Sequence, residues 1–207
     1  MKFKLTDEYR KIAGLQVSKS VTDVNSYLKL CESEYECFKD HIIDPQSILE
    51  LGCGLGRMSI FLNDKLPTSD RNFILADSTN MPEKVTFGWN PSSGFYNDLN
   101  LTSQFCNDHG LSNHTILDLS TESINQLKNI DLVISFLSVG FHYPIENYIP
   151  QLLDITTPEC LFIFGVREDV YNENCLSDHF VIIKLIEQTN INTKENILIM
   201  KKKVNSK

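Results

Sequence analysis

Short apolar runs, separated by polar stretches and helical patterns, alternate along most of the chain. Runs of five to seven residues enclosed by turn formers are typical of β-strands, because a helix needs a longer periodic segment. Seven runs predict strands, at residues 47–51, 73–77, 114–118, 131–137, 160–166, 180–186 and 196–200. The chain therefore alternates between buried strands and the segments that connect them.

One long segment, residues 21–43, has the apolar spacing of an amphipathic helix. Thr22 or Asp23 is a suitable cap at its start, and the pair Asp44-Pro45 ends it. Shorter helical patterns cover residues 57–66, 96–107, 121–128 and 145–155.

Continuous apolar strands that alternate with helices indicate a parallel sheet covered on both faces. The last two strands differ, because the polar stretch 187–195 between them is too short for a crossover helix. We therefore predict an α/β fold, with a mostly parallel seven-stranded sheet, helices on both faces and a C-terminal antiparallel hairpin. In such a sheet a ligand binds at the carboxyl ends of the strands, beside the first strand.

Residues 1–207 are predicted to form a single domain. In this prediction residues 1–45 form an N-terminal helical segment. Residues 78–112 form an insertion, because their number exceeds a usual connection between strands. Two interpretations of the insertion stay open: a lid over the site, or a surface excursion that covers an edge of the sheet.

The chain carries 19 Lys and Arg against 27 Asp and Glu, a net charge of −8. This balance makes nucleic acid an unlikely partner, because an acidic protein repels phosphate backbones. No apolar stretch approaches the ~20 residues that cross a bilayer, so we expect a cytoplasmic protein with no membrane contact. The six cysteines show no zinc-ligand spacing, so no metal site is predicted. The sequence leaves the oligomeric state open.

Three glycines, Gly52, Gly54 and Gly56, directly follow the first strand and precede a helical pattern. Glycine permits a tight turn there and lets a ligand lie against the main chain without a Cβ in the way. The spacing is G-x-G-x-G, whereas the dinucleotide fingerprint G-x-G-x-x-G needs a third glycine where Arg57 stands. The turn therefore favours a nucleotide-type cofactor other than a nicotinamide dinucleotide.

Residues 48–56, with the sequence Ile-Leu-Glu-Leu-Gly-Cys-Gly-Leu-Gly, resemble the first motif of the class I S-adenosylmethionine-dependent methyltransferases. Asp77 ends the second strand and matches the family's ribose-binding acid. Asp118 ends the third strand and matches the acid on the adenine side. The strand order and the final hairpin extend the resemblance from Gln46 to the C-terminus. The resemblance implies a class I methyltransferase fold and S-adenosylmethionine as the cofactor.

The resemblance assigns cofactor binding to residues of the glycine turn and of the strand ends: Glu50, Gly52, Cys53, Gly54, Gly56, Asp77, Asp118, Leu119 and Ser135. A carboxylate accepts two charge-assisted hydrogen bonds from a ribose diol, which suits Asp77. Glu50 attracts the ammonium and sulfonium charges. Structural roles stay open for these acids: a helix-capping or ion-paired carboxylate for Glu50, and a cap for Asp77 and Asp118.

Methyl transfer from a sulfonium needs alignment and exclusion of water, and a general base helps when the acceptor is a hydroxyl. The segment after the fourth strand holds His142, which takes up a proton near neutral pH and is our candidate catalytic base. Tyr143 and Trp89 offer flat apolar surfaces to an acceptor, and Ser138 completes the candidate acceptor site. The alternative for His142 is a hydrogen-bonded residue that stabilises the turn before Pro144.

The fourth strand lacks the Asn-Pro-Pro-aromatic signature of methyltransferases that modify exocyclic amines of nucleic-acid bases. The string Gly-Phe-His-Tyr-Pro at 140–144 resembles a segment of uncharacterised bacterial sugar O-methyltransferase-like proteins. These resemblances predict an S-adenosylmethionine-dependent methyltransferase that acts on a hydroxyl of a small-molecule or sugar-like acceptor. Two alternatives stay open: a catalytically silent cofactor-binding partner subunit, and a nicotinamide-dependent oxidoreductase.

Overall fold

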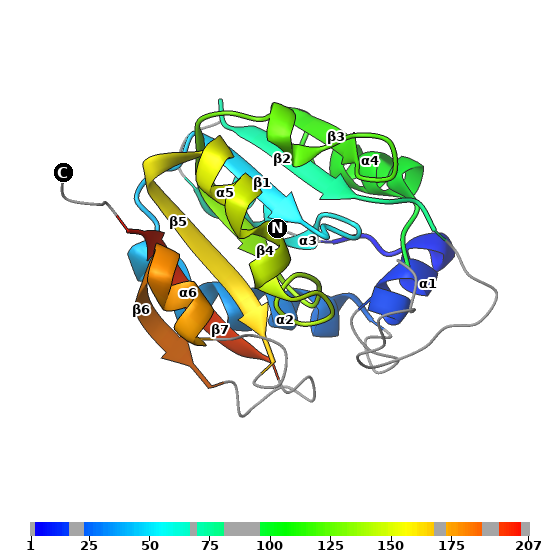
Figure 1. Cartoon of the computed structure of the whole chain (residues 1–207). Coiled ribbons are helices and arrows are strands. Elements are labelled where there is room, and N and C mark those ends of the chain that lie inside the picture. The colour runs from blue at the N-terminus through cyan, green and yellow to red at the C-terminus, as the bar shows by residue number, and fades with distance from the viewer. Residues whose placement is uncertain are drawn as a thin grey trace.

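The computed structural model describes residues 3–16, 23–66, 70–80, 96–167, 173–187 and 195–203. Trp89, one of the predicted acceptor-binding residues, lies outside these ranges. The strands form one sheet with the order β3-β2-β1-β4-β5-β7-β6 (Figure 1). Their bounds are Ser47–Leu51 (β1), Asn72–Asp77 (β2), His114–Asp118 (β3), Ile130–Ser135 (β4), Thr156–Val166 (β5), Phe180–Ile186 (β6) and Asn196–Lys202 (β7).

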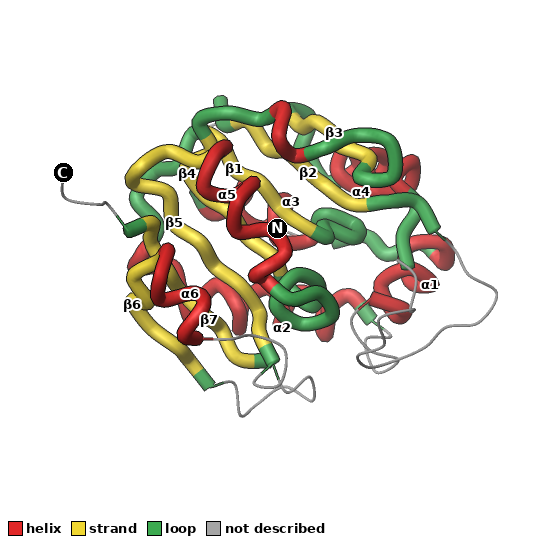
Figure 2. The backbone as a smooth tube through the Cα atoms, in the orientation of Figure 1, coloured by secondary structure: helices red, strands yellow, loops and turns green. Residues whose placement is uncertain are grey.

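Strands β1 to β5 run parallel, and β7 pairs antiparallel with both β5 and β6. Figure 2 shows the strands as one twisted layer with helical segments on both sides. The predicted fold class is therefore confirmed, including the antiparallel hairpin at the C-terminal end of the sheet. The strand order reverses between β1 and β4, and open parallel sheets bind ligands at the carboxyl ends of strands beside such a point.

Helices cover both faces of the sheet. One face, which we call the α2 face, is covered by α1 (Asp7–Gln16), α2 (Val24–Phe38), α3 (Arg57–Lys65) and α4 (Leu99–Asp108). The opposite α5 face is covered by α5 (Ile149–Ile155), α6 (Glu173–His179) and the 3₁₀ turns η2 (Ile124–Gln126) and η3 (Ile145–Tyr148). A further 3₁₀ turn, η1 (Lys39–His41), follows α2. In Figure 1, α5 and α6 lie in front of the sheet.

Successive strand residues alternate between the two faces, as the period of a β-strand requires. In β1, Ile48 packs into the core of the α2 face and Leu49 into the core of the α5 face. The same alternation places Glu50 on the α2 face, where Ser59 of α3 bonds to it. Because both faces are buried, the strands need continuous apolar runs, and this need explains why the sequence pattern located them.

Some element boundaries differ from the prediction. α2 begins at Val24 and ends before η1, and Asp23 is its cap, with a side chain that accepts the Ser26 N–H at 2.9 Å. β4 ends before residue 137, because Leu137 adopts a left-handed φ of 58° that leaves the strand. β5 begins at Thr156, earlier than the predicted residue 160.

The helical pattern predicted at 121–128 forms only the short 3₁₀ turn η2. α1 lies within the predicted N-terminal helical segment 1–45, although its bounds were not predicted, and α6 was not predicted. In α1, Asp7 and Glu8 occupy the first turn, where they suit the positive end of the helix dipole. Its apolar residues Tyr9 and Ile12 are buried. No helix within the described ranges has the length and apolar character that crossing a bilayer requires.

Candidate functional site

The turn after β1 brings bare main chain to the carboxyl edge of the sheet. Its glycines all have left-handed backbone angles, with φ of 64° at Gly52, 54° at Gly54 and 73° at Gly56. This region favours glycine, because a Cβ would approach a neighbouring carbonyl oxygen. The Gly52 N–H donates to Ala76 O at 2.7 Å and ties the turn to β2. The Gly56 N–H donates at 2.8 Å to the carbonyl of Cys53, which is itself buried within the turn.

Asp77 ends β2 beside the glycine turn and is only 5% exposed. Its Oδ2 accepts the Gly54 N–H at 2.8 Å, and its Oδ1 accepts the Ser78 N–H at 2.8 Å. Burial raises the pKa of Asp77 to about 6, and the nearby Asp118 carboxylate adds to the rise. The fold therefore brings together the glycine turn and the two acids that the sequence singled out at the ends of β2 and β3.

Two side chains that the sequence analysis missed lie over the glycine turn. Gln16, at the end of α1, accepts the Leu55 N–H through Oε1 at 3.3 Å, and its Nε2 donates to Asn97 Oδ1 at 3.1 Å. Asn97 donates in turn to Gly54 O at 3.0 Å and to Asp77 Oδ2 at 3.3 Å. A Cβ on Gly54 would collide with the Gln16 amide, so this amide rests directly on the bare main chain.

Glu50 lies on the α2 face of β1 and is 4% exposed. Its Oε2 accepts the N–H of Ser59 at 3.0 Å and also the Ser59 hydroxyl. Ser59 belongs to the first turn of α3, so the carboxyl caps a helix, which is one of the roles that the sequence left open. Burial raises the pKa of Glu50 to about 7, while the bonds from Ser59 oppose the rise. A contact of Glu50 with a cofactor stays a prediction.

Asp118 closes a local turn at the end of β3. Its Oδ1 accepts the Ser120 N–H at 2.9 Å and the Ser120 hydroxyl at 2.7 Å. This is the cap of a turn and not of a helix, since the cap of η2 is Ser123. The Leu119 N–H donates to Asp77 O at 2.8 Å and keeps the ends of β2 and β3 level. Asp118 and Leu119 therefore border the Asp77 side of the site.

Two serines place the post-β4 loop, residues 136–144, against the end of β1 and the glycine turn. Ser135 is fully buried; its hydroxyl donates to the last carbonyl of β1 at 2.7 Å and accepts the Val139 N–H at 3.0 Å. The Ser138 side chain lies over Gly52, where a Cβ would collide with it. Ser135 thus supports the loop from inside the fold, and its contact with a cofactor stays a prediction.

His142 and Tyr143 stand half-buried on the post-β4 loop. The Nδ1 of His142 is buried and has no hydrogen-bond partner among the residues that the structure describes. Burial lowers the pKa of His142, and the Arg167 cation lowers it further. Burial raises the pKa of Tyr143 to about 12, with smaller contributions from Tyr148 and Asp77. Tyr148, on η3, is a further residue of this region that the sequence did not identify.

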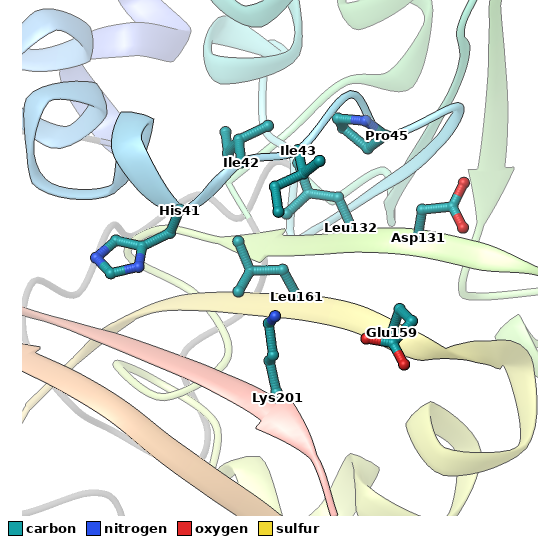
Figure 3. Close-up of a pocket in the computed structure, with 9 residues that line it drawn as sticks. All are labelled: His41, Ile42, Ile43, Pro45, Asp131, Leu132, Glu159, Leu161 and Lys201. Carbon is teal, nitrogen blue, oxygen red and sulfur yellow. The ribbon is translucent and has the colours of Figure 1, made fainter. Parts of the chain in front are cut away.

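A small cavity of ≈ 50 Å³ lies at the opposite, amino-terminal edge of the sheet. Figure 3 shows its lining residues, which are His41, Ile42, Ile43, Pro45, Asp131, Leu132, Glu159, Leu161 and Lys201. Pockets that hold drug-sized ligands measure roughly 300–1,000 Å³. This cavity is therefore too small for a nucleoside, and the carboxyl edge is the candidate site.

No protein-family model matches the chain, and no curated protein matches its sequence. Solved structures do match. The PH0226 protein from Pyrococcus horikoshii OT3 aligns with a TM-score of 0.64 and 12% identity over 96% of this chain and 100% of that one. Ribosomal protein L11 methylase from Lactobacillus delbrueckii subsp. bulgaricus aligns with a TM-score of 0.56 and 12% identity over 86% and 80%.

A SAM-dependent methyltransferase from Aquifex aeolicus aligns with a TM-score of 0.55 and 13% identity, over 88% of this chain and 99% of that one. Similarity at these identities shows the fold. The chain has the class I S-adenosylmethionine-dependent methyltransferase fold, as its glycine motif and terminal hairpin predicted.

Proposed function

We propose that the chain is an S-adenosylmethionine-dependent methyltransferase that transfers a methyl group to a hydroxyl of a small-molecule or sugar-like acceptor. The observation that carries the proposal is the hydrogen bond from the Gly54 N–H to Asp77 Oδ2 at 2.8 Å. It joins a buried carboxyl to bare main chain beside the point where the strand order reverses. The fold shared with methyltransferases supports the same conclusion.

The chemistry of these residues fits the cofactor. A carboxylate oxygen accepts two hydrogen bonds, and the described contacts of Asp77 Oδ1 include one, from the Ser78 N–H. This oxygen retains an acceptor position for a ribose hydroxyl. The amides of Gln16 and Asn97 lie against the same turn and offer both donors and acceptors to the polar groups of a nucleoside.

We assign the remaining cofactor-binding residues to parts of the cofactor by the order in which their strands lie in the sheet. In this proposal Asp118 and Leu119 border the adenine, next to the ribose at Asp77. The glycine turn borders the methionine part, and Glu50 attracts its positive charges from beneath the turn. Glu50 acts at longer range than the other residues, because its carboxyl is already engaged by Ser59.

When bound, the cofactor would supply a methyl group on a positively charged sulfonium, whose sulfur leaves as a neutral thioether when the methyl group is transferred. The protein aligns the acceptor and excludes water from the site. His142 accepts the proton of the acceptor hydroxyl at Nδ1, which is buried with no hydrogen-bond partner in the described part of the chain. Burial holds the pKa of His142 below its ordinary value, so the imidazole is neutral and ready to accept a proton near pH 7. Tyr143, Ser138 and Trp89 bind the acceptor.

Calorimetric titration with S-adenosylhomocysteine tests the cofactor site. The wild type is expected to bind it, and Asp77→Ala is expected to bind it more weakly. Asp40→Ala, which changes an exposed aspartate on η1, is the matched control and should bind as the wild type does. If the wild type and Asp77→Ala bind S-adenosylhomocysteine with equal affinity, Asp77 does not contact the ribose.

A second experiment addresses the acceptor. Transfer of a radiolabelled methyl group from S-adenosylmethionine into fractions of a cell extract, followed by alkaline hydrolysis and sugar analysis, identifies the class of product. Label in neutral hydroxylated metabolites supports the proposal. Label confined to protein or nucleic acid contradicts the proposed acceptor but leaves the cofactor site intact. Cofactor binding without transfer to any fraction would favour a silent partner subunit.

A further inference from the structure

We propose that Glu195 is a positioning residue of this site. Its carboxyl holds Leu137 in a left-handed conformation and thereby orients the post-β4 loop that carries Ser138 and His142. This inference rests on the proposed function, because the loop carries the candidate base and, through Ser138 over Gly52, also lies against the candidate cofactor turn.

Glu195 reaches the loop from a segment 58 positions further along the chain than Leu137. It lies directly before β7, which Figure 1 shows between β5 and β6, and it is fully buried. Its Oε1 accepts the Leu137 N–H at 3.0 Å. Gly165 of β5 makes room for the carboxyl, since a Cβ at that position would collide with it. Gly165 and Glu195 are therefore complementary, because the missing side chain of the one leaves room for the carboxyl of the other.

The residue that Glu195 contacts is the one at which the chain turns away from β4. Leu137 has a φ of 58°, which is costly for a residue with a side chain and persists where the surroundings hold it. Directly after it, Ser138 O accepts the N–H groups of His142 at 2.7 Å and of Tyr143 at 3.2 Å. The direction of the chain at Leu137 therefore sets where the candidate base and the candidate acceptor surface stand.

The second oxygen of Glu195, Oε2, has no hydrogen-bond partner among the described residues. Among the described residues, the charged groups that act on this carboxyl are Glu34 of α2 and Arg57 of α3, and Glu50 of β1 lies on the same face of the sheet. Arg57 already bonds to Glu34, so a charge on Glu195 would gain little compensation. A neutral carboxyl suits this position, because one oxygen can accept the Leu137 N–H without placing a further negative charge beside Glu34.

Burial raises the pKa of Glu195 from 4.5 to about 8, Glu34 adds to the rise, and Arg57 and the Leu137 N–H oppose it. The folded protein therefore favours the protonated form. The contribution of this group to stability is fully present below about pH 4.5 and is lost as the pH rises through about 8. Above that pH the carboxyl that holds the loop is ionised, buried and close to Glu34. We therefore expect the loop to become less firmly held.

Two substitutions separate the hydrogen bond from the charge. Glu195→Gln keeps an oxygen that accepts the Leu137 N–H but cannot ionise, whereas Glu195→Leu fills the same space with no acceptor. At pH 7 we expect Glu195→Gln to bind S-adenosylhomocysteine as the wild type does, and Glu195→Leu to bind it roughly tenfold more weakly or worse. Glu187→Gln and Glu187→Leu, at an exposed residue just after β6, are the matched controls.

Hydrogen exchange at the Leu137 amide measures the contact itself. Exchange should be slow in the wild type and in Glu195→Gln, and fast in Glu195→Leu. Equal protection in all three proteins, or wild-type affinity in Glu195→Leu, would overturn the proposal. Circular dichroism must show that Glu195→Leu is folded before either result is interpreted. If it does not fold, Glu195→Ser takes its place, together with the comparison of the wild type with Glu195→Gln.

The pH dependence of S-adenosylhomocysteine affinity distinguishes a positioning role from a purely structural role, because a purely structural role would not change this dependence. Wild-type affinity for S-adenosylhomocysteine should fall as the pH rises through about 8, whereas the affinity of Glu195→Gln should stay level. If the pH profiles of the wild type and Glu195→Gln coincide, ionisation of the Glu195 carboxyl has no role in binding. If the wild type binds no S-adenosylhomocysteine at any pH, the proposed function fails, while amide exchange at Leu137 still decides whether Glu195 positions the loop.

Discussion

Glu34 of α2 and Arg57 of α3 form an ion pair inside the protein, with Arg57 Nη2 2.7 Å from Glu34 Oε1. Glu34 is fully buried and Arg57 is 6% exposed. Arg57 is the first residue of α3 and follows the glycine turn directly, so the pair attaches α2 to the helix that the turn begins. A helix from the N-terminal segment is thereby tied to the candidate cofactor site.

Breaking this pair should be costly, because the remaining partner would become a buried charge without compensation. We expect Glu34→Ala to lower the free energy of unfolding by about 3–5 kcal/mol, measured by urea denaturation. Asp154→Ala is the control, since it breaks a pair with Lys128 that has a similar distance of 2.7 Å but exposed side chains. That change should cost less than about 1 kcal/mol. Similar losses in both variants would show that the buried pair does not hold α2.

The glycine turn gives a second prediction, on backbone conformation. Gly54→Ala places a Cβ on a residue with a φ of 54° and against the Gln16 amide. We expect a loss of about 1–2 kcal/mol in unfolding free energy and a large loss of S-adenosylhomocysteine binding. Gly14→Ala is the matched control, because Gly14 lies within α1 and a Cβ there meets no atom within 4 Å. That variant should be more stable by about 0.5–1 kcal/mol and bind normally.

The charge of Asp77 gives a third prediction. Asp77→Asn keeps the size of the side chain but removes its charge, and we expect it to weaken S-adenosylhomocysteine binding by roughly 10- to 100-fold. In the wild type, affinity should fall as the pH drops below about 6, because protonation removes the charged acceptor. Calorimetry between about pH 5 and about pH 7, below the range in which Glu195 ionises, should show this slope in the wild type and none in Asp77→Asn. A level wild-type profile would exclude an ionised Asp77 from the binding site.

The sequence predicted the strands well because burial on both faces imposes a local pattern. β1, β3 and β6 have the predicted bounds, at Ser47–Leu51, His114–Asp118 and Phe180–Ile186. The glycine turn and Asp77 were also found from local signals, since the turn directly follows β1 and Asp77 is the last residue of β2. The boundary at Leu137 was wrong, because the apolar run continues through a residue whose left-handed backbone turns the chain away from β4 and whose N–H bonds to Glu195.

The residues that the sequence missed reach the site from distant parts of the chain. Gln16 contacts Leu55, and Glu195 contacts Leu137, across 39 and 58 positions. Periodicity reports which residues share a face of one element, and it carries no information on such contacts. An acid such as Glu195 is also expected at the surface when only composition is considered, since burial of a carboxyl depends on the particular partners that the fold supplies.

His142 gives the final prediction, on the pH dependence of the methyl transfer itself. If Nδ1 accepts the hydroxyl proton, the rate should rise with pH as the imidazole loses its own proton, and burial places that rise below the ordinary histidine pKa of 6.5. His142→Gln should lower the rate by roughly 10²–10⁴-fold and abolish the rise, while cofactor affinity stays unchanged. His179→Gln, at the exposed end of α6, should retain the wild-type profile. If a variant without His142 keeps both the rate and the pH profile, the imidazole has only a structural role in the turn before Pro144. Another group would then have to accept the proton of the acceptor hydroxyl. Tyr143 and Tyr148 are poor proton acceptors near pH 7, because their raised pKa values keep their hydroxyls protonated.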